Sequence, residues 1–354
     1  MEEIMVNPEQ VQQFAQKMLG IYTGGVLTQM IDIGYQTGLF EALKAGPATS
    51  AALSARAGLH ERYVREWLGA MTTSGFFEYD AGTGQFTLPA AHAVLLTGDT
   101  ARNMSPHGRI VNLLGEQVPT LVARFADGEG IPYDAYRPGF THSLDDIWRR
   151  VYDEQLIDGF LGKFPALTAA MDQGIRVLDI GCGTGHALNV LAAAFPRSTF
   201  VGYDLADDGI ALAQAEAEEM GLDNVSFAVM DVTHFPTTPP YDLIMAFDTV
   251  HDLAAPDAVL NRIRAALAPN GAFLMVEFKF SSLLEENIGN PFAPMYYGFS
   301  LLHCTPVSLY FGGSGLGAVW GEQTARRMLA DAGFHDITVV DTPRPQNYMF
   351  LSRR

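Results

Sequence analysis

The fold of this 354-residue chain is decided by the stretch Val177-Leu-Asp-Ile-Gly-Cys-Gly-Thr-Gly185. A short apolar run ends at Ile180, a glycine-rich turn follows, and a helical pattern begins near His186. In open α/β sheets, ligands bind at the carboxyl ends of parallel strands. Glycine lets the backbone come close to a ligand, and a helix N-terminus offers unpaired N–H groups. We therefore expect a bound ligand at this loop; the alternative is a tight turn without one.

Outward from this loop, short apolar runs alternate with helical patterns. The strands are expected at 175–180, 199–204, 225–230, 242–247 and 272–278, and the helices at 186–195, 207–220 and 256–267. This alternation predicts an α/β fold, a parallel sheet with helices on both faces. Two further strands, 337–341 and 348–351, are joined by too few residues for a crossover helix, so the last pair is expected to be antiparallel.

The N-terminal part of the chain is mostly helical. Within it we expect helices at 50–58 and 60–74, followed by a hairpin with strands 75–79 and 85–88. This order is the winged-helix arrangement. We therefore predict two domains, a helical one over residues 1–165 that contains the winged helix, and an α/β one over residues 166–354.

Composition narrows the class of protein. With 22 Lys and Arg against 40 Asp and Glu, the net charge of −18 disfavours nucleic acid and anionic membranes as partners. Two cysteines, Cys182 and Cys304, are too few for a disulfide framework or a cysteine-based zinc site, and no metal is expected. Met1-Glu2-Glu3 is unlike the start of an export signal, and no apolar stretch reaches the roughly 20 residues of a membrane span. We expect a soluble cytoplasmic protein.

The spacing of the glycine loop separates two kinds of cofactor. The dinucleotide fingerprint is G-x-G-x-x-G, whereas this loop reads G-x-G-x-G, with His186 in the place of the third glycine of that fingerprint. Asp179 stands two residues before the first glycine, where a carboxylate can face an amino group. The stretch resembles the E/D-x-G-x-G-x-G signature of the class I S-adenosylmethionine-dependent methyltransferases. Their cofactor carries an ammonium and a sulfonium and no phosphate, which suits an acidic loop.

The resemblance implies roles for two more acids at strand ends. Asp204 would bind both ribose hydroxyls and Asp231 the adenine amino group; the alternative for each is a helix cap. Phe247 would pack near the sulfonium or the adenine. The implied sheet order is 3-2-1-4-5-7-6. The S-adenosyl-L-methionine site is thus expected to consist of Asp179, Gly181, Cys182, Gly183, Gly185, Asp204, Leu205, Asp231, Val232, Phe247 and Asp248.

After the fourth strand, the segment 246–253 resembles the His-Asp motif of small-molecule O-methyltransferases. That resemblance nominates His251 as the general base, with Asp252 or Asp248 orienting its ring and Glu277 assisting. An ordinary histidine pKa of about 6.5 suits proton abstraction from a phenol. The alternatives are a histidine that packs at the strand end and a glutamate that holds a backbone amide. The second assisting glutamate of those enzymes has no counterpart, since residues 315–320 read Gly-Leu-Gly-Ala-Val-Trp.

Aromatic residues mark the expected acceptor pocket. The segment 290–304 is dense in Phe, Tyr and Met, with His303 beside Cys304, and suits one wall of an apolar pocket or packing between the domains. Residues 99–165 are expected to form the opposite wall and a lid. The tyrosines that could contact the acceptor are Tyr22, Tyr133, Tyr136 and Tyr152.

A winged helix also occurs in proteins that read DNA. In the expected recognition helix, however, Arg62 and Arg65 are balanced by Glu61 and Glu66, and residues 1–98 hold five basic against nine acidic side chains. A DNA-reading face concentrates positive charge. The resemblance instead implies a dimerisation module that also covers the acceptor site, and hence a homodimer.

Together these features predict an enzyme that transfers the methyl group of S-adenosylmethionine to a small apolar or aromatic acceptor, at oxygen rather than nitrogen or carbon. The alternatives are an N- or C-methyltransferase that relies on alignment alone, and a regulator or scaffold that binds S-adenosylmethionine without turnover.

Overall fold

The structure, a computed structural model, describes residues 6–354 and separates into two compact units, one up to Asn112 and one from Leu113 onward. The division falls within helix α6 (His107–Glu116). Residues 113–165 thus pack with the second unit, whereas the sequence interpretation groups them with the N-terminal domain as its lid. That functional grouping into 1–165 and 166–354 stays a prediction. Met1–Glu3, on which the expectation about an export signal rests, lie outside the described residues.

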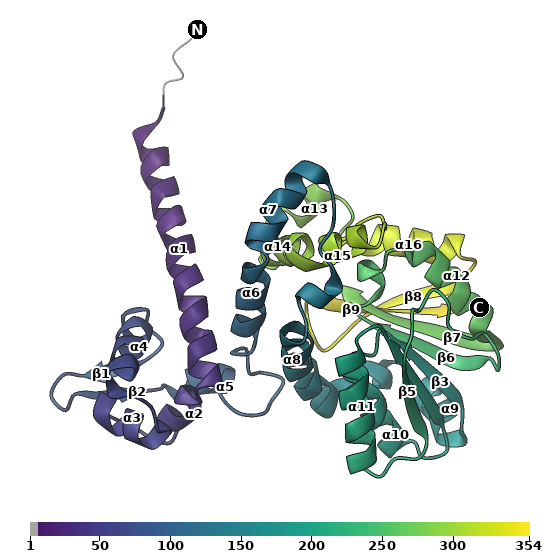
Figure 1. Ribbon diagram of the computed structural model, residues 1–354, viewed down its shortest axis with the longest axis horizontal. Helices are drawn as coiled ribbons and strands as arrows, with labels where there is room; N and C mark the ends of the chain where they lie inside the picture. The colour runs from purple at the N-terminus through teal and green to yellow at the C-terminus, as the bar shows by residue number, and fades with distance from the viewer. Residues whose placement is uncertain (1–5) are drawn as a thin grey trace, which may run out of the picture. The chain divides into compact units, whose positions relative to one another are not determined.

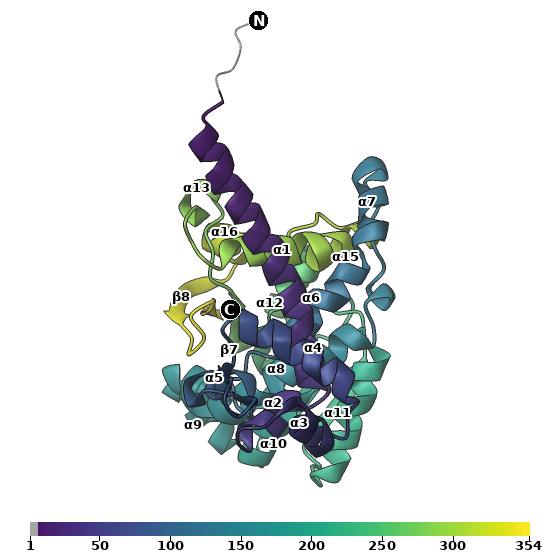
Figure 2. The same cartoon turned by 90° about the vertical axis from the view of Figure 1, so that its left-hand side faces the viewer.

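The first unit begins with the long helix α1 (Pro8–Gln36), which leads into a winged helix (Figure 2). Asn7 caps α1 by accepting a hydrogen bond from the Glu9 N–H, and Pro8 takes the first helical position, where its missing N–H is no loss. The elements that follow are α2 (Leu39–Lys44), α3 (Ser50–Ala57), α4 (Glu61–Thr73), β1 (Glu78–Asp80), β2 (Gln85–Thr87) and α5 (Ala90–Leu96). The predicted helix pair and hairpin are confirmed.

Aromatic packing holds α1 against the winged helix. Trp67 lies edge-on to Phe40, with ring centroids 5.3 Å apart, and its indole N–H donates to the Met30 carbonyl at 2.8 Å. A Cβ on Gly34 would lie 2.6 Å from both rings. Gly34 therefore allows the backbone of α1 to lie directly on this aromatic core.

The second unit is built on a seven-stranded sheet with the order β5-β4-β3-β6-β7-β9-β8 (Figure 1). Its strands are β3 (Arg176–Ile180), β4 (Thr199–Asp204), β5 (Val225–Val229), β6 (Tyr241–Phe247), β7 (Leu267–Phe278), β8 (His335–Asp341) and β9 (Asn347–Arg353). The neighbouring pairs from β5 to β7 are parallel, and β9 is antiparallel to both β7 and β8. Counted from β3 as the first strand, this is the order 3-2-1-4-5-7-6. The predicted α/β class, sheet order and antiparallel last pair are confirmed.

Helices cover both faces of the sheet (Figure 1). They are α9 (Pro165–Gln173), α10 (His186–Ala194), α11 (Asp207–Glu219), α12 (Pro256–Ala266) and α16 (Gly321–Asp331). Val259 and Ile263 of α12 pack with Leu329 of α16 against the fully buried Ile244 and Phe273 of the sheet. Since the central strands are buried on both faces, their sequences read as continuous apolar runs.

The remaining helices lie before the sheet and between β7 and α16. The first set is α7 (Val118–Asp127), η1 (Tyr133–Ala135), α8 (Gly139–Gln155), η2 (Leu156–Phe160) and η3 (Leu161–Lys163). The second is α13 (Leu284–Asn287), α14 (Ala293–Phe299), η5 (Ser300–Cys304) and α15 (Thr305–Tyr310). The short turn η4 (Val250–Asp252) stands apart from both sets and directly follows β6. From residue 6 to the C-terminus, no helix is both long and apolar enough to span a membrane.

Candidate active site

The glycine loop joins the end of β3 to the start of α10. Gly181, Gly183 and Gly185 have φ angles of 67°, 55° and 71°, where a residue with a Cβ is strained. A Cβ on Gly181 would lie 2.3 Å from Thr249, and one on Gly185 would lie 2.5 Å from Phe227. A Cβ on Gly183 would have no neighbouring atom within 4 Å among the described residues. The outer two glycines therefore allow close packing, while the middle one leaves space beside the loop.

Two buried carboxylates flank this loop. Asp179 is 3% exposed, and its Oδ1 has no hydrogen-bond partner among the described residues. Asp204 accepts hydrogen bonds from the Gly183 N–H and the Ala206 N–H, both at 2.8 Å, so β4 and the loop hold each other. Burial, and then the charge of Asp204, raise the pKa of Asp179 well above its usual range. A buried, unsatisfied carboxyl of this kind calls for a cationic partner.

The next predicted cofactor residues lie at the ends of β4 and β5. The Asp231 side chain is 53% exposed and accepts from both the backbone N–H and the hydroxyl of Thr233, at 2.8 and 2.7 Å. It thus caps a turn, whereas the alternative interpretation expects it to cap a helix, and its contact with a nucleoside stays a prediction. Val232 is buried, and Leu205 is about half exposed. These apolar side chains offer surfaces for a planar ring.

The end of β6 lies beside the same loop. The ring of Phe247 is in edge contact with that of Tyr152, with centroids 5.5 Å apart. Asp248 has an unusual φ of 49° and accepts a hydrogen bond from Asn347 Nδ2 at 3.0 Å. Burial, and then the charge of Glu277, raise the pKa of Asp248 to about 8. The half-buried thiol of Cys182, in the loop, has its pKa raised by burial.

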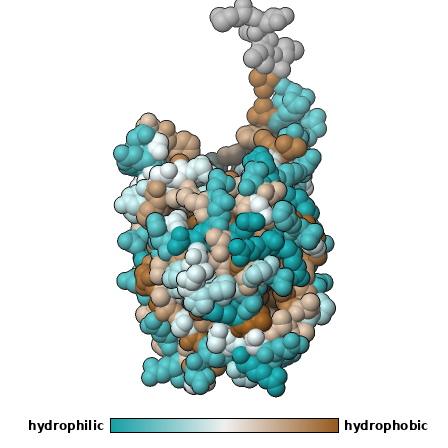
Figure 3. Space-filling view, turned by 90° about the vertical axis from the view of Figure 1, so that its right-hand side faces the viewer, coloured by the Kyte–Doolittle hydropathy of each residue, from teal (hydrophilic) through white to brown (hydrophobic). Residues whose placement is uncertain are grey.

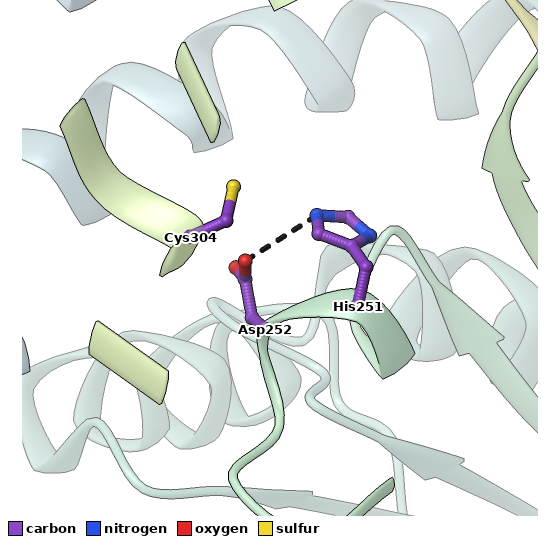
Figure 4. Close-up of side chains that lie close together, drawn as sticks. All are labelled: His251, Asp252 and Cys304. Atoms are coloured by element: carbon purple, nitrogen blue, oxygen red, sulfur yellow. Dashed lines mark ion pairs between the residues drawn. The ribbon is translucent and has the colours of Figure 1, made fainter. Parts of the chain in front are cut away.

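The three predicted catalytic residues come together, as Figure 4 shows for two of them. His251 is 2% exposed, and its Nδ1 lies 2.6 Å from Oε2 of the fully buried Glu277 on β7. Its Nε2 lies 3.4 Å from Asp252 Oδ1. The indole N–H of Trp320 donates to the same Glu277 oxygen at 3.2 Å. Glu277 therefore holds a histidine ring and not a backbone amide, and it fixes the orientation of that ring.

The two carboxylates change the acid–base chemistry of His251. Burial opposes a charged ring, but the charges of Glu277 and Asp252 outweigh it and raise the pKa of His251 well above its usual value. The ordinary pKa assumed from the sequence is therefore wrong for the free protein, because a sequence does not show two carboxylates on either side of one ring.

The segment at η5 closes the other side of His251. His303 stacks on Phe140 of α8 at a centroid distance of 4.1 Å and meets Tyr136 edge-on at 4.7 Å. The Tyr136 hydroxyl donates to the Leu302 carbonyl at 2.7 Å, and Tyr133 lies 6.0 Å from the His303 ring. Tyr133 and Tyr136 thus join the predicted wall 290–304, whereas Tyr22 belongs to α1 in the other unit.

The comparisons with known proteins agree with this arrangement. Residues 171–333 match the family model of a methyltransferase domain, and residues 25–98 match that of an Rv2258c-like winged helix-turn-helix domain. With its strand order and glycine loop, the second unit is therefore identified. It is a class I methyltransferase domain. The first unit is a winged-helix domain.

Relatives of the methyltransferase domain are moderately similar. Malonyl-[acyl-carrier protein] O-methyltransferase of Bacillus cereus is 28% identical over 47% of this chain and 55% of its own, so this chain spans about half of that relative. Acetylserotonin O-methyltransferase of Mus musculus is 27% identical over 73% of this chain and 72% of its own. The structure of human N-acetylserotonin methyltransferase in complex with SAM shares the fold, with 19% identity, 99% coverage of both chains and a TM-score of 0.68.

The two arginines of helix α4 in the winged-helix domain form ion pairs with glutamates of the same helix. Arg62 lies 2.6 Å from Glu66, and Arg65 lies 2.6 Å from Glu61, each pair one helical turn apart on α4. Each of these two guanidinium groups thus has a carboxylate partner on the same helix. The charge balance noted in the sequence is present in the structure as two ion pairs.

Sequence reasoning missed several residues that contact the candidate site residues or their neighbours. From the sequence alone, Trp320 is noted only as the end of the segment 315–320, which lacks the second assisting glutamate. In the structure, the indole N–H of Trp320 donates a hydrogen bond to Glu277. Trp148 stacks on Tyr152 at 5.2 Å, and the Arg344 guanidinium lies 4.6 Å above the Trp148 ring. No motif marks these residues, because they meet the site only through folding of distant segments.

Proposed function

We propose that the protein transfers the methyl group of S-adenosylmethionine to an oxygen atom of a small, apolar or aromatic acceptor. The observation that carries the proposal is His251, held by Glu277 at the carboxyl edge of the same sheet whose glycine loop carries an unsatisfied Asp179. Asp179, which suits a cation, thus lies on β3, and the buried proton acceptor His251 lies on η4, directly after the neighbouring strand β6. The similarity to O-methyltransferases of known activity supports oxygen as the acceptor atom.

The residues around the loop fit S-adenosylmethionine. Asp179 would bind its ammonium group, Asp204 the ribose and Asp231 the adenine. Asp204 already accepts two backbone hydrogen bonds, but a carboxylate has about four acceptor positions, so two remain. The cofactor supplies an activated methyl group on sulfur. Phe247 and Val232 offer apolar contacts for its rings, and Gly183 keeps the loop surface open.

His251 would act as the base. Its Nδ1 is bound by Glu277, so the Nε2 is the atom that would take the acceptor proton. Glu277 then stabilises the charged ring that forms, and Asp252 adds a second negative charge at 3.4 Å. The aromatic wall of Phe140, Tyr136 and His303 would limit access of water and align the acceptor oxygen with the methyl group.

The cofactor is tested by calorimetry of the full chain with S-adenosylmethionine and, separately, with NAD. We expect binding of S-adenosylmethionine, weakened about tenfold or more in Asp179→Asn, because the amide cannot pair with an ammonium. The exposed Asp257→Asn is the control and should bind normally. Binding of NAD alone would overturn the cofactor.

The base is tested with His251→Ala against His335→Ala, an exposed histidine on β8. Over a panel of phenols, carboxylic acids and amines, His251→Ala should keep cofactor affinity and lose about 10²–10⁴-fold in turnover, the usual contribution of a general base. An unchanged rate would favour transfer by alignment alone, at nitrogen or carbon. Cofactor binding without turnover of any acceptor in the wild type would favour a regulator or scaffold.

The homodimer and the cytoplasmic location belong to the same proposal. Helix α1 exposes large apolar side chains along its length, among them Val11, Phe14, Leu19, Tyr22 and Val26, and Figure 3 shows apolar residues in brown just below the grey terminus. Such a surface is typical of an interface between chains. In sedimentation analysis, Phe14→Glu should convert the dimer to a monomer. A monomeric wild type would contradict the proposed homodimer.

The cytoplasmic location is supported by the cysteines. Both are free thiols, which is compatible with a reducing compartment.

A further inference from the structure

A second group of polar side chains lies on the side of His251 away from Glu277. Asp252 follows His251 on η4, and Cys304 ends the π-helical turn η5; Figure 4 shows these three side chains facing one another. One donor atom from each, a ring nitrogen, a carboxylate oxygen and the thiol sulfur, lies within 4.8 Å of the others. A fourth group, His303, places its Nδ1 3.8 Å from Asp252 Oδ2.

Several atoms of this group lack partners. Both ring nitrogens of His303 are buried without a hydrogen bond in the part of the chain that the structure describes, and His303 itself is only 3% exposed. Asp252 Oδ1 has its ion pair with His251 but no hydrogen bond within the described residues. Buried polar groups in proteins are almost always satisfied, by protein, water or an ion. Unsatisfied atoms on two neighbouring side chains, Asp252 and His303, therefore indicate a missing partner.

The contacts of His251 would allow it to serve as a metal ligand as well as a base. Metal-binding histidines usually donate their second N–H to a carboxylate, which fixes the tautomer and makes the free nitrogen a better donor. Glu277 accepts that hydrogen bond from Nδ1 at 2.6 Å, and Trp320 in turn binds Glu277 at 3.2 Å. The Nε2 thus faces Asp252 and Cys304 from a fixed position.

We propose that His251 Nε2, the Asp252 carboxylate and Cys304 Sγ bind a divalent cation of the zinc class, with His303 Nδ1 as the fourth ligand. Two imidazoles, a carboxylate and a thiolate form a donor set that selects zinc or cobalt over magnesium or calcium. Tetrahedral bonds of about 2.0–2.3 Å bring such ligands to about 3.3–3.8 Å from one another, so closure needs shifts of roughly 1 Å. Binding requires a deprotonated thiol and a neutral His251 ring and therefore releases protons to solvent.

The position of this site has a consequence that rests on the proposed function. The nitrogen that would bind the metal is the same Nε2 that would accept the proton of the methyl acceptor. A bound cation therefore occupies the lone pair of the base, and methyl transfer stops until the metal leaves. The metal site itself does not depend on that reaction.

The experiment is a titration of the full-length protein, freed of metal with a chelator, with Co²⁺. We expect one equivalent to bind, with visible bands of tetrahedral cobalt, a near-ultraviolet band of a cobalt–thiolate bond, and displacement by Zn²⁺. Cys304→Ser should lose the thiolate band and bind at least tenfold more weakly, and His303→Asn should bind more weakly but keep the band. Cys182→Ser is the matched control for cysteine and should bind cobalt with the same affinity and the same thiolate band as the wild type.

Two results would overturn the proposal. One is less than a tenth of an equivalent of cobalt bound at 100-fold excess; the other is a thiolate band that survives Cys304→Ser or disappears in Cys182→Ser, which would mean an adventitious ion only. Each variant is also tested for S-adenosylmethionine binding, so that loss of metal is not confused with loss of the fold. Inhibition of methyl transfer by Zn²⁺, reversed by chelator, tests the consequence separately; an inactive wild type would overturn the proposed function and leave the cobalt result intact.

Discussion

The two halves of the site are held together in different ways. On the cofactor side, backbone groups do the positioning: glycines with positive φ shape the loop, and Asp204 is held by two backbone N–H groups. On the acceptor side, side chains hold side chains: His251 by Glu277, and Glu277 by Trp320. A backbone-built site needs particular residues at fixed spacing, whereas a side-chain-built site can draw on any segment that folds close.

The largest effect on stability should come from a substitution in the glycine loop on the cofactor side. Gly185→Ala forces a Cβ into a left-handed conformation and places it 2.5 Å from Phe227. Left-handed strain of about 1–2 kcal/mol and overpacking of about 1–3 kcal/mol together predict a loss of about 2–5 kcal/mol in the free energy of unfolding. Urea unfolding measures it.

Gly183→Ala is the matched control for this prediction. It carries similar backbone strain but no overlap, because no neighbouring atom lies near the added Cβ. Its loss should be about 1–2 kcal/mol. Equal losses for the two variants would show that packing against Phe227 does not set the loop.

Replacing a residue on the acceptor side should change the pH dependence of methyl transfer. The pKa of His251 is raised, so a rate that needs the neutral ring rises with pH, with a midpoint above the ordinary 6.5. Glu277→Gln removes one of the two carboxylates that stabilise the imidazolium, and the midpoint should move to lower pH. Loss of the orienting partner should also lower the limiting rate about 10–100-fold. The measurement is the pH–rate profile at saturating S-adenosylmethionine with chelator present; an unmoved midpoint would contradict it.

The same contrast explains what could be predicted from the sequence. The strands and the glycine loop were predicted because hydrophobic runs and glycine spacing are local signals. The strand order was implied by the family resemblance. His251, Asp252 and Glu277 were named through a family motif, and the structure places them together. Their roles in catalysis stay predictions.

The remaining features could not be predicted because they depend on distant segments. Trp320 lies 43 residues beyond Glu277, and His303 meets Phe140 and Tyr136 across more than 160 residues. The raised pKa of His251 follows from two carboxylates that only the fold brings to one ring. A single sequence carries no signal for any of these contacts.

One network on the cofactor side is also built from side chains, and breaking it should have a smaller effect on stability than Gly185→Ala. Behind the glycine loop, His186 Nδ1 lies 3.0 Å from Glu216, and Asn189 and Arg149 also donate to Glu216. Burial opposes the charge of Glu216, but these hydrogen bonds outweigh it and lower its pKa to about 2.

A lowered carboxyl pKa stabilises the fold above the unfolded-state value of about 4.5, and this contribution is lost as the pH falls towards 2. Glu216→Gln should therefore flatten the pH dependence of urea unfolding between these values. It should also cost about 1–2 kcal/mol at pH 7, a modest figure because the pair is partly exposed. The exposed Glu218→Gln is the control. A steep acid limb that persists in Glu216→Gln would show that side chains do not stabilise the loop side.

The smallest effect should come from replacing Trp320, which acts on His251 only through Glu277. Trp320→Phe removes the N–H that partly neutralises Glu277, so the imidazolium of His251 is stabilised more strongly. The midpoint of the pH–rate profile should then move to higher pH, opposite to Glu277→Gln, with a stability loss of about 1 kcal/mol for the missing hydrogen bond. Trp67→Phe is the matched control, since that buried indole also donates a hydrogen bond, to Met30 in the winged-helix unit. It should cost similar stability and leave the midpoint unchanged. If both variants shift the profile alike, Trp320 acts through general stability, and the chain of side chains that orients His251 ends at Glu277.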